Sequence, residues 1–385
     1  MVQRKIPFNV PYLTGKEEEY VLDALRSRAH CGNHAYADRC IELLKERYGF
    51  HSVFLTTSCT TAMEMGAILA NLALGDEVIL PSYTFTSTVN AIVLRGVRPV
   101  FCDVDPETMN IDVSLIEPLI TEKTKMILPI DYAGIPCEID AIMEIAQRRG
   151  LTVMQDAAQS FHSFHKDGRA CGSVPPLAAF SFHESKNAAC GEGGALIVND
   201  PNLVDRARIV QEKGTDRALV LKGVQNKYGW ADIGSSFLLA DILAAMLLAQ
   251  IEGTDEIVAK RGKVTQAYRE LYKPYEAKSC LKMPKPPPGV KINNHAFFVV
   301  FDTEDNQKRF LSLLRTKEIH AYIGYVPLHS YVMGRKLGYR PEDVPLTENI
   351  AKRIVRLPFY ADMADAGLDY CIEGMGDVLR EIYGF

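Results

Sequence analysis

The chain has 385 residues, of which 47% are hydrophobic and 24% charged, and its net charge is −5 with histidine counted as neutral. This is the composition of an ordinary globular protein, and its acidic balance excludes a general attraction to nucleic acid or to an anionic membrane. The length predicts roughly two domains. Nine cysteines without a CxxC pair argue against a disulfide framework and a zinc site, so we expect no metal and a reducing, cytoplasmic location.

Neither the start of the chain nor its most apolar segment predicts a membrane location. Residues 1–20 contain no apolar stretch of the kind found in a secretory signal. The most apolar long segment, 236–251, is short for a bilayer span and is interrupted by Asp241. We therefore expect this segment to form a buried core helix.

Short runs of strand-forming residues recur through the first half of the chain. Most of them are continuously apolar, which is typical of strands covered on both faces in a parallel sheet. Helical patterns lie between them, for example at 60–74 and at 138–150. This alternation predicts an α/β domain with a mostly parallel central sheet. The expected strands are 53–57, 77–81, 99–104, 125–130, 151–156, 177–182 and 195–198.

The second half of the chain has a different pattern. A long helical stretch is expected over 231–272, and the proline-rich segment 284–289 excludes both helix and central strand. Strand and helix patterns alternate again beyond it. We therefore predict a large α/β domain over residues 1–250, including an N-terminal segment, and a smaller α+β domain over 251–385.

Two residues that carry chemistry follow predicted strands. Asp156 closes the run 151–156, and residues at the carboxyl ends of strands in an open α/β sheet face the ligand crevice. Lys186 follows the run 177–182 and precedes the glycine-rich GEGG. A buried lysine with a lowered pKa forms imines, and a carboxylate beside a pyridine nitrogen keeps that nitrogen protonated. Taken singly, Asp156 also suits a helix cap and Lys186 a solvated loop.

The segment TTSCTTAMEM leads from a predicted strand into a predicted helix. Ser58, Cys59 and Thr60 offer backbone amides and hydroxyls there, where the helix dipole favours an anion such as a phosphate. An ordinary helix cap is the alternative. Phe85 follows the strand at 77–81 and is a candidate either for stacking on a planar ligand or for the core.

Together these segments resemble the sugar aminotransferase family of fold-type I pyridoxal-phosphate enzymes, often named after DegT, DnrJ, EryC1 and StrS. The resemblance implies an aspartate aminotransferase-like fold with pyridoxal 5'-phosphate as cofactor. It also implies a homodimer with the active site at the subunit interface. It extends over nearly the whole chain, through SCTTAME, PSYTFTSTVNA, QDAAQS, SFHESKN with GEGG, YGWADIGSSFLLADILAAMLLAQI, YVPLH and RLPFY.

The resemblance also implies roles for individual residues. Lys186 matches the lysine that forms the Schiff base with the cofactor, and Asp156 matches the partner of the pyridine nitrogen. Gln159 matches the residue near the ring hydroxyl, and Phe85 the aromatic that stacks on the ring. The positions that match phosphate ligands are Ser181, Cys59 and Thr60, beside Ser58.

Further candidates lie in the matching segments outside this set. His183, Tyr325 and His329 are candidate contacts to the sugar or its diphosphate, with a structural role as the alternative for each histidine. Lys222 and Lys227 are candidates for the nucleotide diphosphate, and a solvated loop is the alternative for both. No nucleic acid is expected as a partner.

One position departs from the family pattern. Many relatives have an asparagine, contributed by the partner subunit to the cofactor phosphate, where this chain has Gly229. That cross-subunit contact is therefore an open question.

Within the family, SFHESKN, LTTSCTTAMEM, EKGTDR and YGWADIGSSF resemble the dTDP-4-amino-4,6-dideoxygalactose transaminases. This implies amination of dTDP-4-dehydro-6-deoxy-D-glucose with L-glutamate as donor. Amination at C3, a gluco product at C4, and a UDP- or GDP-sugar substrate are alternatives. Dehydration is a further one, although the dehydratase branch has a histidine where this chain has Lys186. A non-catalytic protein on the same fold is disfavoured by the intact lysine, aspartate and phosphate loop.

Overall fold

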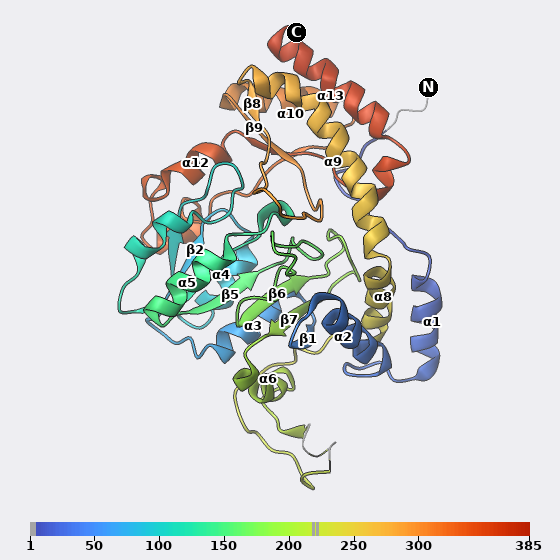
Figure 1. Ribbon diagram of the computed structural model, residues 1–385, viewed down its shortest axis with the longest axis vertical. Helices are drawn as coiled ribbons and strands as arrows, with labels where there is room; N and C mark the ends of the chain where they lie inside the picture. Colours follow the sequence, from blue (N-terminus) through green and yellow to red (C-terminus); the bar gives the residue numbers. More distant parts are fainter. Residues whose placement is uncertain (1–4, 218–219, 221–222) are drawn as a thin grey trace.

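The computed structural model describes residues 5–217, 220 and 223–385 (Figure 1). A seven-stranded sheet lies at its centre, in the order β1-β7-β6-β5-β4-β2-β3. Neighbouring strands are parallel except that β7 is antiparallel to β1 and β6. The predicted α/β fold with a mostly parallel sheet is therefore confirmed. The strands are β1 (Ser52–Thr56), β2 (Glu77–Pro81), β3 (Arg98–Cys102), β4 (Thr124–Ile127), β5 (Thr152–Asp156), β6 (Leu177–Ser181) and β7 (Gly194–Val198).

Helices cover both faces of this sheet, which explains why its strands are apolar throughout. In β6, Leu177 and Ala179 contact one helical layer, while Ala178 and Phe180 contact the other. The first layer contains α3 (Cys59–Leu69), α4 (Thr86–Val93) and α6 (Val204–Gln211). The second contains α1 (Glu17–Ser27), α2 (Ala35–Tyr48), α5 (Ile139–Arg149) and α8 (Asp241–Glu252).

A second, antiparallel sheet has four strands in the order β10-β11-β9-β8 and lies in the upper part of Figure 1. Its strands are β8 (Leu281–Lys282), β9 (Phe298–Phe301), β10 (Tyr322–Ile323) and β11 (Ile354–Arg356). The helices of this part are α9 (Thr254–Ala277), α10 (Glu304–Thr316), α11 (Val332–Lys336), α12 (Pro345–Ala351) and α13 (Leu368–Tyr383). The predicted boundary between residues 250 and 251 falls inside α8, and the division into two domains stays a prediction.

None of the helices in the described ranges is both long and apolar enough to cross a membrane. Short 3-10 turns connect several of the elements. The 3-10 turns are Val113–Leu115, Glu117–Leu119, Tyr132–Gly134, Pro201–Leu203, Pro341–Asp343 and Ala361–Ala364.

The helical stretch expected over 231–272 begins later than predicted. Residues 231–240 are extended and form isolated bridges, among them Thr56 with Leu238. Phe237 and Leu239 are both buried, so this segment alternates as a strand does and does not follow a helical period. Pairing with the edge of the large sheet therefore overrides the helical appearance of its apolar sequence.

Asp241, which interrupts the apolar segment, has a structural role. It is buried at the first position of α8, where its carboxylate accepts hydrogen bonds from the backbone N–H groups of Tyr36 (3.3 Å) and Ala37 (2.8 Å). These amides belong to the first turn of α2. The residue before this helix, His34, forms no capping hydrogen bond through its side chain. An aspartate of one helix thus caps another and favours the packing of the two.

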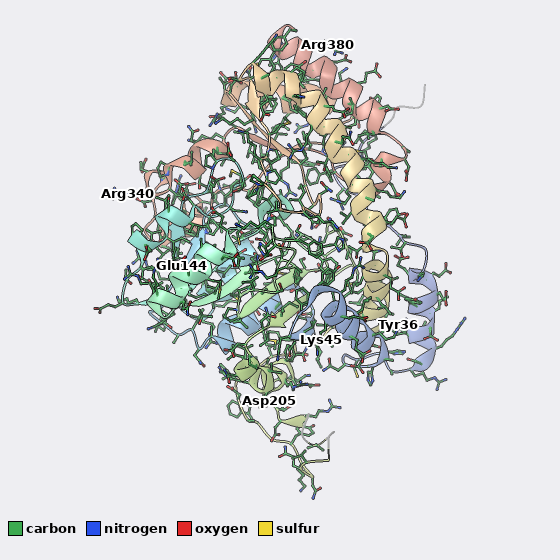
Figure 2. All side chains as sticks on the ribbon, in the orientation of Figure 1. Tyr36, Lys45, Glu144, Asp205, Arg340 and Arg380 are labelled. Atoms are coloured by element: carbon green, nitrogen blue, oxygen red, sulfur yellow. The ribbon has the colours of Figure 1, made fainter. Side chains whose placement is uncertain are left out.

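We predict that Asp241→Ala lowers the free energy of unfolding by about 1–3 kcal/mol, because two buried amides lose their acceptor. The thermal unfolding midpoint of the purified variant measures this. Asp205→Ala is the matched control, since Asp205 lies on the outer surface of α6 (Figure 2) and its side chain is fully exposed. An Asp241 variant as stable as the Asp205 variant would contradict the capping role.

Candidate functional site

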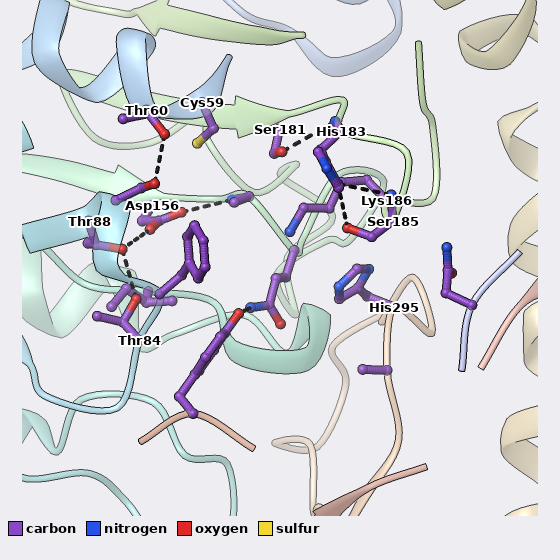
Figure 3. A pocket seen from close by; sticks show the side chains of 18 of the residues that line it. Cys59, Thr60, Thr84, Thr88, Asp156, Ser181, His183, Ser185, Lys186 and His295 are labelled. Atoms are coloured by element: carbon purple, nitrogen blue, oxygen red, sulfur yellow. Dashed lines mark hydrogen bonds between the residues drawn. The ribbon is translucent and has the colours of Figure 1, made fainter. Parts of the chain in front are cut away.

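A cavity of about 470 Å³ lies between the carboxyl ends of the large sheet's strands and the small sheet. Figure 3 shows side chains from both regions converging on it. Among the predicted site residues that the structure describes, His329 and Lys227 are absent from its lining. Those that line it are Ser58, Cys59, Thr60, Phe85, Asp156, Gln159, Ser181, His183, Lys186 and Tyr325.

Asp156 is buried at the end of β5, and two groups of the chain donate hydrogen bonds to its carboxylate. The Thr88 hydroxyl donates to Oδ2 at 2.7 Å, and the Ala158 amide donates to Oδ1 at 3.1 Å. Thr84 contacts the Thr88 hydroxyl at 2.8 Å, so a chain of hydroxyls ends at the carboxylate (Figure 3). Burial raises the pKa of Asp156, while these hydrogen bonds and the charge of Lys186 oppose the rise.

Lys186 lies on the loop that joins β6 to β7. The loop is closed by backbone hydrogen bonds, including that from the Lys186 amide to the His183 carbonyl at 2.9 Å. The residue is half-buried because the cavity opens beside it. Enclosure lowers the pKa of the amine to about 8, and Arg356 adds to this, whereas Cys59 and Asp156 act in the opposite direction. The uncharged, nucleophilic fraction of the amine near neutral pH is therefore larger than that of an ordinary lysine.

The N-terminus of α3 supplies anion-binding groups on the same wall. The Ser58 hydroxyl caps the amide of Thr61 and so leaves the amides of Cys59 and Thr60 for another acceptor. Gly194 begins β7 directly behind this turn, where any Cβ atom would collide with the backbone of Ser58 and Cys59. The glycine-rich sequence after Lys186 thus allows the sheet to approach the helix N-terminus closely.

Gln159, Tyr325 and Phe85 form a further part of the lining. The Gln159 amide group donates to the Tyr325 hydroxyl at 3.1 Å and accepts from the Ala133 amide at 2.8 Å, which fixes its orientation. Phe85 precedes α4 and is 57% exposed, with its ring centroid 6.2 Å from that of Tyr325. Phe85 is therefore not a core residue, and its ring is available to a planar ligand in the cavity.

The two predicted histidines have different environments. His183 lines the cavity and contacts the Ser185 hydroxyl at 2.9 Å. His329 is completely buried, with Nδ1 2.6 Å from the Ser82 hydroxyl and Nε2 3.7 Å from Glu348. The expectation that His329 contacts a substrate is therefore corrected, because its ring nitrogens face protein groups outside the cavity.

Two of the loop positions considered above, one for the nucleotide and one for the partner subunit, lie away from this chain's own cavity. Gly229 and Lys227 are exposed and do not line it, and the Gly229 amide donates to Asp216 at 2.7 Å. Lys222 lies outside the described residues. The contact across subunits at residue 229 therefore stays open.

Sequence reasoning missed several groups that line the cavity. Thr88 lies in the quoted segment PSYTFTSTVNA and Arg356 in RLPFY, but only the fold shows which side chain of each segment faces inward. Arg261 and His295 line the cavity too, but they lie outside the segments that carry the family resemblance. No group of three or more side chains suited to a metal ion occurs in the part of the chain that the structure describes.

The residues present fit pyridoxal phosphate. The cavity combines an amine of lowered pKa, a hydrogen-bonded carboxylate, a helix N-terminus with free amides, and an accessible aromatic ring. These are the groups that an aldehyde, a pyridine nitrogen, a phosphate and a planar ring respectively require.

Comparison with known proteins gives matches over nearly the full length. A model of the DegT/DnrJ/EryC1/StrS aminotransferase family matches residues 11–376. The chain is 30% identical to the spore coat polysaccharide biosynthesis protein SpsC of Bacillus subtilis, with 99% of each chain covered. It is 29% identical to GDP-perosamine synthase of Escherichia coli O157:H7, covering 97% of this chain and 98% of that protein.

Solved structures of aminotransferases have the same fold. A DegT DnrJ EryC1 StrS aminotransferase from Brucella abortus has a TM-score of 0.84 at 27% identity, with 96% of each chain covered. The aminotransferase TlmJ from Streptoalloteichus hindustanus has a TM-score of 0.89 at 25% identity, covering 98% of this chain and 100% of that chain.

We predict that Thr88→Val weakens the binding of pyridoxal phosphate by on the order of 10- to 100-fold, because the Asp156 carboxylate loses its hydroxyl donor. The loss also raises the pKa of Asp156 further and so disfavours the ionised form. Absorbance titration of the cofactor-free protein measures the dissociation constant. Thr88→Ser retains the hydroxyl and is expected to bind as the wild type does. Equal affinity in the valine variant would exclude this role of Thr88.

Proposed function

The chain belongs to the DegT/DnrJ/EryC1/StrS aminotransferase family, and we propose that it aminates C4 of a nucleotide-linked 4-keto-6-deoxy sugar. The proposed substrate is dTDP-4-dehydro-6-deoxy-D-glucose, the donor is L-glutamate, and the product is dTDP-4-amino-4,6-dideoxy-D-galactose. The observation that carries the proposal is the placement of Lys186 and Asp156 in one cavity beside the N-terminus of α3.

Pyridoxal phosphate is the cofactor of this family. When bound, it supplies an aldehyde for the amino group and a protonated ring that draws electrons from the reacting carbon. We propose that the Lys186 amine holds the cofactor between reactions and then moves a proton from Cα of glutamate. An amine with a pKa of about 8 suits both the removal and the return of that proton near neutral pH.

Asp156 is proposed to hold the proton on the pyridine nitrogen. Its carboxylate is most useful when ionised, and burial opposes ionisation. The hydrogen bonds from Thr88 and Ala158 favour the charged form and fix the direction of the carboxylate. The same two hydrogen bonds therefore stabilise the negative charge of the Asp156 carboxylate and fix its orientation.

The remaining lining residues are assigned by position. The amides of Cys59 and Thr60, with the hydroxyls of Ser58 and Ser181, are proposed to bind the cofactor phosphate. Phe85 is proposed to stack on the ring, and Gln159 to contact the ring hydroxyl. His183 and Tyr325 border the remaining space and are proposed to contact the sugar.

A GDP-linked 4-keto-6-deoxy sugar is the second candidate substrate, favoured by the 29% identity to GDP-perosamine synthase. The dTDP-sugar is preferred because the segments around Lys186 and Ser58 resemble the dTDP-sugar branch. The two candidates share the reaction at C4 and differ in the nucleoside.

The homodimer is part of the proposal. Beside Gly229, Tyr228 and Trp230 are 58% and 84% exposed. Large aromatic side chains that gather on an exposed loop are typical of a surface that another chain covers. The cytoplasmic location likewise stays a proposal, in keeping with a nucleotide-sugar substrate.

We predict a two-step spectral response from the purified holoprotein. Glutamate removes the absorbance of the lysine-linked cofactor, and the correct ketosugar restores it. Lys186→Ala is expected to lack this absorbance and to lose transamination. Lys263→Ala is the control, because Lys263 is exposed on α9.

Proton NMR of the product distinguishes the substrates and the configuration at C4. A normal rate in the Lys186 variant would rule out the proposed lysine. Release of a keto-deoxy sugar without nitrogen from the donor would show dehydration instead of amination. If the enzyme converts the GDP-sugar and not the dTDP-sugar, the GDP-sugar is the substrate and the first assignment is wrong.

A further inference from the structure

His295 is a titratable group of the cavity to which the proposed function gives no task. It lies just before β9 and lines the cavity from the side of the small sheet. Its exposed fraction is only 5%. Figure 3 shows its ring and the Lys186 side chain on the same side of the cavity. An enclosed imidazole is costly unless its nitrogens find hydrogen-bond partners, so the partner of each nitrogen indicates what the ring does.

Asn187 determines which ring nitrogen carries the hydrogen. Its Nδ2 donates to the Asn293 carbonyl at 2.7 Å, which fixes the amide so that Oδ1 faces His295. This oxygen lies 3.1 Å from Nδ1 of His295, and an amide oxygen accepts and does not donate. Nδ1 therefore carries the hydrogen, and Nε2 keeps a lone pair.

The same buried network fixes the orientation of the ring. The His295 amide donates to Oδ1 of Asn293 at 3.0 Å. Nδ2 of Asn293 donates to the carbonyls of Gln159 at 2.8 Å and Phe161 at 2.7 Å. Buried amide groups whose donors are used in this way resist reorientation. Nε2 bonds to no residue that the structure describes, so its lone pair is left for a group inside the cavity.

The imidazole of His295 is neutral in this environment. Burial lowers its pKa well below the ordinary value, and the charges of Lys186, Arg261 and Arg356 lower it further. The pKa of Lys186, at about 8, therefore lies above that of the imidazole. Where the two groups share a proton, the lysine keeps it and His295 accepts a hydrogen bond.

The Lys186 amine requires such an acceptor once it is free. In the proposed mechanism the amine is joined to the cofactor between reactions and is released when the donor takes its place. Enclosure and nearby charges account for its lowered pKa, and no hydrogen bond from a described residue contributes. A partly protonated amine in an enclosed site is stabilised by an acceptor, and its flexible four-carbon stem is otherwise free to move.

Other acceptors that line the cavity are less suited to the freed amine. The Asp156 carboxylate already accepts two hydrogen bonds and is assigned to the ring nitrogen. The side-chain oxygen of Gln159 accepts from the Ala133 amide. The Glu192 side chain is 68% exposed, so water competes for its carboxylate. Nε2 of His295, in contrast, is enclosed and unused.

We propose that Nε2 of His295 accepts a hydrogen bond from the freed Lys186 amine and holds the amine beside the reacting carbon during the proton transfers. The proton stays on the lysine in this contact. His295 is thus a positioning residue, because it acts through Lys186. The inference rests on the proposed function, since it concerns the state of the same lysine in the same cavity.

The first test measures the pKa of Lys186 in the cofactor-free protein. The variants His295→Met and His295→Gln have side chains of equal length, but the amide oxygen is a good acceptor and the thioether a weak one. Competitive acetylation over a pH series, read by peptide mass spectrometry, gives the pKa of each lysine. In the methionine variant the pKa of Lys186 is expected to fall, because a hydrogen bond to the protonated amine is lost. The glutamine variant is expected to stay closer to wild type. Lys263, exposed on α9, is the control lysine in each sample.

The second test follows the glutamate half-reaction of the holoprotein. In the methionine variant its maximal rate is expected to fall by on the order of 10-fold, because the amine that moves the proton is less well placed. The glutamate concentration at half-maximal rate is expected to stay within about twofold, since His295 does not contact the donor. The isotope effect with α-deuterated glutamate is expected to rise, because proton transfer then limits the rate more strongly. The ketosugar half-reaction is expected to slow as well, and the glutamine variant to recover much of both rates.

An unchanged Lys186 pKa in the folded methionine variant would overturn the proposal. Equal losses in the methionine and glutamine variants would also overturn it, because that result indicates a packing role. Slowing of the ketosugar half-reaction alone would replace it by a direct contact to the sugar. If the methionine variant does not fold, His295→Phe keeps a planar ring without the acceptor and takes its place. If wild type takes no ketosugar, the proposed sugar substrate fails, while acetylation and the glutamate half-reaction still test His295.

Discussion

The site depends on the parallel pairing of β5 with β6. In this register Asp156 lies opposite Ala179, and the amides of Asp156 and Ala157 bond to the carbonyls of Pro129 and Ala179 at 2.9 Å each. The backbone that carries the carboxylate is therefore fixed from both sides. The loop that leaves β6 returns as β7 and carries Lys186, so the sheet itself brings both groups to one edge.

Enclosure in the cavity moves both groups toward their neutral forms, but the tasks that we propose for them differ. For Lys186 the neutral form is the useful one, and little in its surroundings opposes the loss of charge beyond Cys59 and Asp156. The role proposed for Asp156 requires the charged form, and hydrogen bonds from Thr88 and Ala158 support that form. A single cavity thus tunes an amine and a carboxylate differently through hydrogen bonding, which is how one site supplies both a base and an ion.

Much of the fold could be predicted because apolar strands and the residues that follow them are local features. Each of the seven expected strands has a counterpart in the large sheet within a few residues. The extended segment 231–240 was mistaken for helix because its pairing partners, such as Thr56 and Glu212, are distant in sequence. His329 illustrates the same limit, since a motif indicates proximity to a site without giving the direction of the side chain. Thr88 needed the fold, because only the packed structure shows that its hydroxyl donates to Asp156.

The central claim, that Lys186 is the residue joined to the cofactor, is tested most directly by chemical trapping. Borohydride reduction of the holoprotein makes the lysine–cofactor bond permanent, and peptide mass spectrometry then locates the added group. The account predicts one modified peptide, with the label on Lys186. A label on another lysine, such as Lys227 of the exposed loop, would contradict it.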